Sequence, residues 1–155
     1  MLEGFTFRFS KMVVETATQT YFISGHIDLT PVEFRSHYVD KIEEAIENGG
    51  HFVVGDSRGA DSLAQLYLAS HITDTSRVVV YHLGREPLNN LGCFPTHGGF
   101  TNHTEKDSMM TYSSHQDIVY VRRQRYGKQC NQTGTSGTQK NIDRRKEMNM
   151  HKRGI

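Results

Sequence analysis

The chain has 155 residues, 35% of them hydrophobic, with 18 Lys and Arg against 17 Asp and Glu. This length suits one domain with one core, and the clustered apolar residues exclude a collagen-like or fully disordered chain. No stretch approaches the roughly 20 apolar residues that cross a membrane, the first residues lack the apolar segment of a secretory signal, and Cys93 and Cys130 are too few for a disulfide scaffold. We therefore expect a cytoplasmic protein with no membrane partner.

The chain divides into an extension, a domain and a tail. Residues 1–18 show neither strict alternation nor a helical stripe, and we interpret them as an N-terminal extension. The predicted domain covers residues 19–148, and residues 149–155 form a basic C-terminal tail. The first predicted strand is residues 20–25, because this apolar run is rich in aromatic and β-branched residues and stops at Gly25.

A helix is expected shortly after this strand. Thr30, Pro31 and Glu33 have the spacing of a capping box with Pro at the first helical position. The helix extends to about residue 48, where Gly49-Gly50 ends it. The apolar residues on its predicted buried stripe are Val32, Val39, Ile42, Ala45 and Ile46.

Two further strands enclose a second helix. The strands are predicted at residues 51–55 and 77–81, and the helix at residues 59–71. The helical residues expected to face inward are Leu63, Ala64, Tyr67 and Leu68.

The last third of the predicted domain begins with a segment of no clear period. Residues 84–104 are rich in Gly, Asn, Pro and Thr, and we expect a long functional or mobile connection there. A short helix at residues 106–112, a strand at 117–121 and a helix at 139–147 follow. Strands that alternate with helices favour parallel pairing. The sequence therefore predicts a Rossmann-like three-layer α/β/α sandwich with a mainly parallel sheet of four or more strands.

Three segments at strand ends or helix starts carry candidate ligand-binding residues, because ligands of parallel sheets gather beyond the carboxyl ends of the strands. The first segment is Ser24, Gly25 and His26, and the third is Ser136, Gly137 and Thr138. The second segment comprises Gly55, Asp56, Ser57, Arg58, Gly59, Ala60 and Asp61.

The second segment has the residues of a phosphate site. Gly55 and Gly59 allow the backbone to approach a ligand, and the free N–H groups of the helix that follows favour an anion. Arg58 is a candidate for a phosphate contact, and Asp61 for a helix cap or for accepting from a ribose hydroxyl. The alternative is a tight strand-to-helix turn with Asp61 as its cap and Arg58 in water.

The third segment repeats this pattern. Gly137 leaves the backbone accessible, while Ser136 and Thr138 offer hydroxyl groups at a helix start, where the alternative is an ordinary N-cap. Two helix starts directed at one crevice are suited to a nucleotide and its phosphate. His26 follows the first strand and is a candidate for stacking on a base or binding phosphate, or for a supporting role.

Taken in order, these motifs resemble those of the SLOG superfamily. The motif from Gly55 to Asp61, followed by Leu63 and Ala64, resembles its glycine-rich motif, and Phe22-Ile-Ser-Gly-His26 resembles its first strand and turn. Residues 105–117 resemble its helix with an Arg-Asp pair, and residues 136–141 resemble its Gly-Thr phosphate loop. The resemblance covers roughly residues 20 to 147 and implies a Rossmann-like domain that binds nucleotides or nucleotide-derived ligands, commonly as a homodimer.

The sequence departs from the catalytic members of this superfamily. Its phosphoribohydrolases, the "lonely guy" proteins, carry a Glu where this chain has Asn141, and an amide cannot replace a carboxylate as a general base. Lys106 also stands where the family often has Arg. Asp28, Asp56, Asp61 and Asp107 are the remaining acids near the expected crevice. Of these, Asp56 is our candidate catalytic residue, with a cap or a turn hydrogen bond as its alternative role.

We predict no metal site and no bound cofactor. Cys93, His97 and His103 have tolerable spacing for metal ligands, but they lie in a Gly-rich segment without a convincing fourth ligand. Met109, Met110 and Tyr112 are expected to pack the short helix onto the sheet.

Three functions remain open at this point. The first is the binding of a nucleotide or nucleotide-derived small molecule, and the second is cleavage or transfer at the N-glycosidic bond of a nucleotide. The third is binding of single-stranded nucleic acid, as by the related DNA-processing protein DprA. This possibility arises because ten Lys and Arg stand against two acidic residues from Arg122 onward, and eight against fifteen before it. We rank it last because the basic residues do not form a stripe with regularly interleaved aromatic residues.

Overall fold

The computed structural model describes residues 17–122 and 136–154. Five strands are present in this part of the chain: β1 (Thr20–Ser24), β2 (His51–Val54), β3 (Val78–Leu83), β4 (Thr96–Phe100) and β5 (Gln116–Val119). The same residues form five α-helices: α1 (Pro31–His37), α2 (Val39–Glu47), α3 (Ala60–His71), α4 (His103–Tyr112) and α5 (Gly137–Lys152). No α-helix lies between β3 and β4, which follow one another along the chain. A short 3-10 helix, η1 (Thr75–Arg77), precedes β3.

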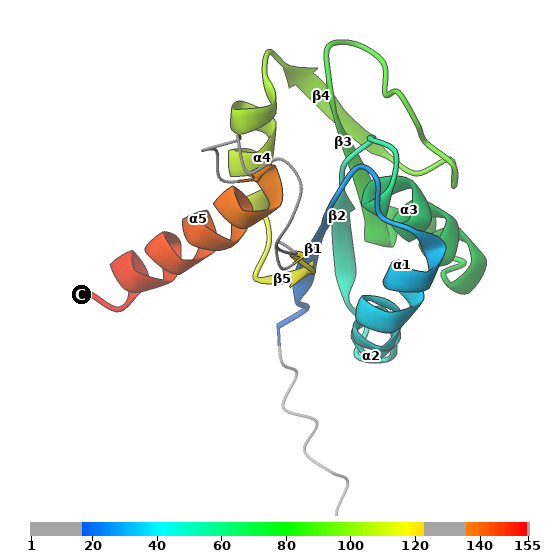
Figure 1. The fold of residues 1–155 in the computed structure, drawn as a ribbon, viewed down its shortest axis with the longest axis horizontal. Coiled ribbons are helices and arrows are strands. Elements are labelled where there is room, and N and C mark those ends of the chain that lie inside the picture. Colours follow the sequence, from blue (N-terminus) through cyan, green and yellow to red (C-terminus); the bar gives the residue numbers. More distant parts are fainter. Residues whose placement is uncertain (1–16, 123–135, 155) are drawn as a thin grey trace, which may run out of the picture.

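The strands form one parallel sheet in the order β4-β3-β2-β1-β5 (Figure 1). Central strand β1 pairs with β2 on one side, where Phe22 lies opposite Val53, and with β5 on the other, where Ile23 lies opposite Ile118. The chain therefore reverses its direction of travel across the sheet between β1 and β5. The fold is a Rossmann-like three-layer α/β sandwich, as the alternation of strands and helices predicted.

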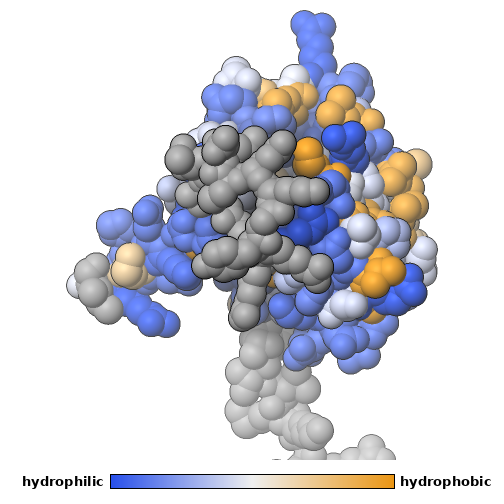
Figure 2. All heavy atoms as spheres, viewed as in Figure 1, coloured by the Kyte–Doolittle hydropathy of each residue, from blue (hydrophilic) through white to orange (hydrophobic). Residues whose placement is uncertain are grey.

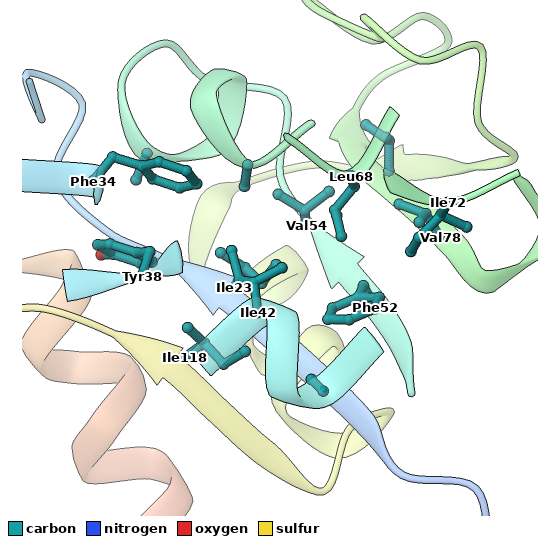
Figure 3. Close-up of a cluster of buried hydrophobic side chains, with 14 of the residues drawn as sticks. Ile23, Phe34, Tyr38, Ile42, Phe52, Val54, Leu68, Ile72, Val78 and Ile118 are labelled. Carbon is teal, nitrogen blue, oxygen red and sulfur yellow. The ribbon is translucent and has the colours of Figure 1, made fainter. Parts of the chain in front are cut away.

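One face of the sheet is covered by α1, α2 and α3. The side chains of Ile23, Val54, Val78 and Ile118 point to this face and pack against the helices (Figure 3). Helix α3 contributes Ala64 and Leu68 as predicted, with Leu63 and Tyr67 partly buried against the same cluster.

The opposite face carries α4 and α5. Alternate side chains of the same strands, namely Phe22, Val53 and Tyr81, pack with Phe100 and Met110 in a second cluster. The expectation for α4 was only partly right, because Met110 is buried whereas Met109 and Tyr112 are exposed. The two clusters make the central strands apolar on both faces, which is why their sequences are nearly continuous apolar runs.

The helix predicted for residues 31–48 is interrupted at Tyr38. The predicted capping box is present, with Thr30 and Glu33 bonded reciprocally, and α1 ends at His37 before α2 begins. Tyr38 is fully buried and its hydroxyl donates to the Ser24 carbonyl at 2.7 Å. Because of this change of direction, Val32 lies on the surface instead of on the predicted buried stripe.

The segment expected to be a long connection contains the edge strand β4. It pairs in parallel with β3, and its Gly98 lies against the ring of buried His82, where an added Cβ would overlap the imidazole. Helix α4 also starts earlier than predicted, at His103, with Asn102 as its N-cap.

Helix α5 is longer than predicted. It begins at Gly137 and reaches Lys152, so residues 149–152 of the predicted tail are helical. The helix projects from the body of the molecule (Figure 1), and its visible surface is mainly hydrophilic (Figure 2). Within the described residues, no helix has the length and apolar character required to cross a membrane.

Candidate functional site

A cavity of about 440 Å³ lies at the carboxyl ends of β1 and β2, between the first turns of α3 and α5 and one side of α4. Its position follows from the reversal of strand order beside β1, where helices on the two faces diverge and leave a crevice. Ten of the fourteen predicted site residues line it: Ser24, Gly25, His26, Gly55, Ser57, Asp61, Ser136, Gly137, Thr138 and Asn141.

Asp56, the predicted catalytic residue, is not part of the cavity lining. Its side chain is buried, and Oδ2 accepts the N–H of Leu88 at 2.8 Å, while its carbonyl accepts from Asn89 Nδ2 at 3.1 Å. Asp56 therefore fastens the segment after β3 to the end of β2. This carboxylate thus makes a long-range hydrogen bond, in place of the turn hydrogen bond given as its alternative role.

Arg58, Gly59 and Ala60 also lie outside the lining. Arg58 is exposed, while Gly59 has a φ of 74° and packs against the backbone of the turn after β1, where a Cβ would overlap Ile27. The N–H of Ala60 donates to the carbonyl of His26 at 3.1 Å. Gly59 and Ala60 thus join the two strand ends.

Six further residues line the cavity that the site prediction did not include. Four of them lie on one face of α4, at the spacing of successive helical turns. The six residues are Phe22, Ile27, His103, Lys106, Asp107 and Met110. The resemblance of residues 105–117 to a family motif was the sequence signal that pointed to this helix.

Lys106 is the least expected member of the site. It is 4% exposed, yet its ammonium group has one ionic contact among the described residues, 3.7 Å from Asp107 Oδ1. No described oxygen accepts a hydrogen bond from it. A buried ammonium group requires strong compensation, and one long ion pair supplies only part of it. The cavity therefore holds a cation suited to a further anionic partner.

Asp61 lies beside Lys106 at the first turn of α3. Its Oδ2 accepts the N–H of Ser57 at 3.1 Å, and a Cβ added to Gly55 would overlap this oxygen and come within 3.2 Å of Lys106 Nζ. Burial raises the pKa of the Asp61 carboxyl to about 7, with the charge of Lys106 opposing this shift. The missing side chain of Gly55 thus leaves the room that both side chains occupy.

The N-termini of α3 and α5 both face the cavity. No side chain caps α3, and the N–H groups of Asp61 and Ser62 have no acceptor among the described residues. In α5, the Ser136 hydroxyl accepts from Gln139 N–H at 3.1 Å, so Ser136 is an N-cap. The N–H groups of the two residues between them have no acceptor within residues 17–122 and 136–154.

Asn141 is 5% exposed and lines the cavity one turn into α5. Its Oδ1 accepts from Arg144 Nη1 at 2.7 Å, which leaves the amide NH₂ group as a donor. This position therefore offers the cavity a hydrogen-bond donor and no carboxylate.

A polar cluster supports the rim near His26. The Nε2 atom of His26 accepts the N–H of Arg122 at 3.0 Å, and burial together with the charge of Arg122 lowers the His26 pKa. Arg122 also forms ion pairs with Glu33 at 2.7 Å and Asp28 at 2.8 Å. His26 is therefore held as a neutral ring.

The arrangement suits an anion more readily than a metal ion. Two helix starts and one ammonium group supply donors and positive potential, while Phe22 and Met110 supply an apolar wall. The described residues include no group of three or more His, Cys, Asp or Glu placed to hold a metal ion.

Comparisons with protein-family models, with curated proteins and with solved structures gave no match. Membership of the SLOG superfamily, the homodimer and the cytoplasmic location therefore stay predictions from the sequence. The fold and the residues around its cavity are the basis for assigning a function.

Proposed function

We propose that this protein binds a nucleotide or a nucleotide-derived small molecule in the cavity beside β1. The observation that carries the proposal is Lys106, a buried ammonium group with one long ion pair, in a cavity that two helix N-termini also face. A phosphate group satisfies all three features at once.

The remaining lining matches the other parts of such a ligand. Asp107 accepts from sugar hydroxyl groups, and Phe22, Ile27 and Met110 contact the sugar and base. The cavity volume of about 440 Å³ lies in the usual range for small-molecule sites.

Calorimetry with AMP and adenosine tests the proposal. We expect AMP to bind at least about tenfold more tightly than adenosine, because charge-assisted hydrogen bonds to the phosphate are each worth about 1.5–3 kcal/mol. Equal affinities would contradict the phosphate site.

A pair of variants locates the phosphate. Lys106→Met keeps the apolar stem but removes the charge, and we expect AMP binding to weaken by roughly ten- to a hundredfold. Arg58→Met is the matched control, because exposed Arg58 lies outside the cavity lining, and we expect at most about a twofold change. A larger loss of affinity in Arg58→Met than in Lys106→Met would indicate that Arg58, and not Lys106, binds the phosphate.

Cleavage of a nucleotide N-glycosidic bond is a second candidate function. The observation that favours it is that two carboxylates, Asp61 and Asp107, line the cavity although Asp56 does not. In this reaction water adds to the sugar carbon and the base leaves with a proton. Incubation with a panel of nucleoside monophosphates should release free base, and Asp107→Asn or Asp61→Asn should abolish the release. If nucleotides bind but no base is released, the result contradicts cleavage and supports binding alone.

A further inference from the structure

The anion site and the Asp61 carboxyl share one helix start. Asp61 is the second residue of α3, and its own N–H is one of the two groups that this helix offers to a ligand. Any anion that accepts from this N–H therefore lies beside the Asp61 side chain. The Ser57 N–H occupies Oδ2, and no described residue donates to Oδ1.

The charges around this point favour one added proton. With both carboxylates ionised, Asp61, Lys106 and Asp107 together carry one net negative charge, which opposes the entry of an anion. With a proton on Asp61, the three side chains together carry no net charge. The carboxylic acid also becomes a hydrogen-bond donor to a ligand oxygen. Lys106 is itself an independent sign of a ligand, because it is nine-tenths buried and makes no hydrogen bond to a described residue.

The other charged groups that face Asp61 do not balance the net negative charge of Asp61, Lys106 and Asp107. Helix α4 presents Lys106, Asp107 and the cavity-lining His103. Asp107 and Asp56 both disfavour the ionised form of Asp61, and the first turn of α5 contains no acidic residue. His26 is held neutral by its contact with Arg122. Burial raises the Asp61 pKa to about 7, so the group is divided between its two forms near neutrality before any ligand arrives.

We propose that the site takes up the anionic group of its ligand together with a proton, which Asp61 holds on Oδ1, the carboxyl oxygen that accepts from no described residue. This inference rests on the proposed function and names how the same site is regulated. Affinity for a phosphate ligand then falls as the pH rises above neutrality, by up to about tenfold for each pH unit.

The test is calorimetry with AMP from about pH 5.5 to about pH 8.5, a range that brackets neutrality. Three forms of the chain are compared: wild type, Asp61→Asn and Asp143→Asn. In Asp61→Asn the amide keeps the acceptor for Ser57 and a permanent donor, so it imitates the protonated acid. Asp143→Asn removes the same charge from an exposed position on α5. Dividing the wild-type Kd by that of each variant cancels the ionisation of the AMP phosphate.

We expect the ratio of wild-type Kd to Asp61→Asn Kd to be close to one at the acid end and roughly 30 at the alkaline end. Asp143→Asn should follow the wild type throughout. A flat ratio for Asp61→Asn with AMP binding intact overturns the proton uptake but leaves the proposed function standing. Loss of the same pH dependence of Kd in Asp143→Asn also overturns the proposal, since Asp61 would then not be the group responsible. Absence of AMP binding by the wild type at every pH overturns both.

A second measurement needs no variant. Wild-type calorimetry at about pH 8 in two buffers of different ionisation enthalpy counts the protons bound with AMP, whose phosphate is already a dianion there. Uptake close to one proton supports the proposal, and zero uptake with AMP bound overturns it even if Asp61→Asn does not fold.

Discussion

Gly55 is the residue on which the geometry of the site depends most directly. It follows β2, and its missing side chain is what allows the Asp61 carboxyl and the Lys106 ammonium group to occupy the same corner. Since its φ is not in the left-handed region, the requirement for glycine here is steric and not conformational.

Gly55→Ala should therefore destabilise the fold and weaken AMP binding together. We expect a loss of about 1–3 kcal/mol in the free energy of unfolding, because the new methyl group overlaps Asp61 Oδ2 in a packed site. Urea denaturation gives the free energy and calorimetry gives the affinity. Gly137→Ala is the control, since a Cβ there meets nothing within 4 Å and stability should change by at most about 0.5 kcal/mol. Equal stability of the two variants would contradict the steric argument.

The raised pKa of Asp61 also makes stability depend on pH. The native state holds this proton up to about pH 7, whereas an unfolded Asp loses it near its ordinary pKa of 3.8. The native state thus binds more protons between these values, and the contribution of Asp61 to stability falls as pH rises through that window. We expect wild type to lose stability relative to Asp61→Asn between about pH 4 and about pH 7, measured by urea denaturation.

The comparison with Asp61→Asn separates this effect from that of His26. The lowered pKa of His26 acts in the opposite direction, because its contribution is lost as pH falls below its ordinary value of 6.5. Parallel pH profiles of the wild type and Asp61→Asn would show that the Asp61 proton is not retained in the native state.

The sequence predicted correctly which segments come together at the cavity. It was less successful in predicting which side chains of these segments line it. Asp56 and Asp61 flank the same turn, and both were candidates. Their roles differ because Asp56 is engaged by Leu88 and Asn89, in a segment whose sequence has no period, while the first turn of α3 directs Asp61 to the cavity. The roles of the two carboxylates thus depend on the direction in which α3 presents Asp61 and on the distant segment that bonds Asp56. Neither can be predicted from the motif.

At the scale of elements, α5 is attached by an unusual polar seam. Its three buried residues are Thr138, Asn141 and Arg145. The guanidinium group of Arg145 pairs with Asp117 at 2.9 Å and donates to the carbonyls of Thr111 and Ser114 at 3.0 and 2.7 Å. This seam joins α5 to α4 and β5 and so holds the α5 half of the anion site in place.

Arg145→Met should loosen α5 because it leaves the Asp117 side chain, which is 11% exposed, without its ionic partner. We expect a loss of about 3–5 kcal/mol in stability or, if α5 separates alone, loss of amide-exchange protection confined to that helix. Hydrogen exchange with mass spectrometry distinguishes the two outcomes. Lys146→Met on the exposed side of α5 is the control and should leave the protection of α5 unchanged. Unaltered exchange in Arg145→Met would mean that the seam does not hold the helix.

The elements that sequence reasoning missed were those imposed by tertiary contacts. Strand β4 contains Thr96, His97 and two glycines, a poor strand composition, and it is extended because it pairs with β3. The break between α1 and α2 arises where Tyr38 turns inward to bond the ends of β1 and β5, through Ser24 and Tyr120. By contrast, β1, β2 and β3 are buried on both faces and were predicted closely, since burial shaped their composition.

At the scale of the whole molecule, the sheet order explains why one small cavity depends on distant parts of the chain. Strand β1 lies between β2 and β5, so the crevice beside it is bounded by α3 from one half of the fold and by α4 and α5 from the other. Parallel pairing could be predicted from the alternation of elements, but the reversal beside β1 could not, because it depends on where β5 docks.

A ligand in this cavity should therefore stabilise α3 together with α4 and α5, which lie on the other face of the sheet. At AMP concentrations about 100 times Kd, we expect global stability to rise by about 2.7 kcal/mol, as binding to the native state alone requires. Hydrogen exchange should slow in the first turns of α3 and α5 and along α4 together, since each contributes lining residues. Adenosine at the same concentration is the control and should produce a much smaller shift. Slowing restricted to α5 would indicate that AMP binds to that helix alone, and the cavity would then not be the binding site.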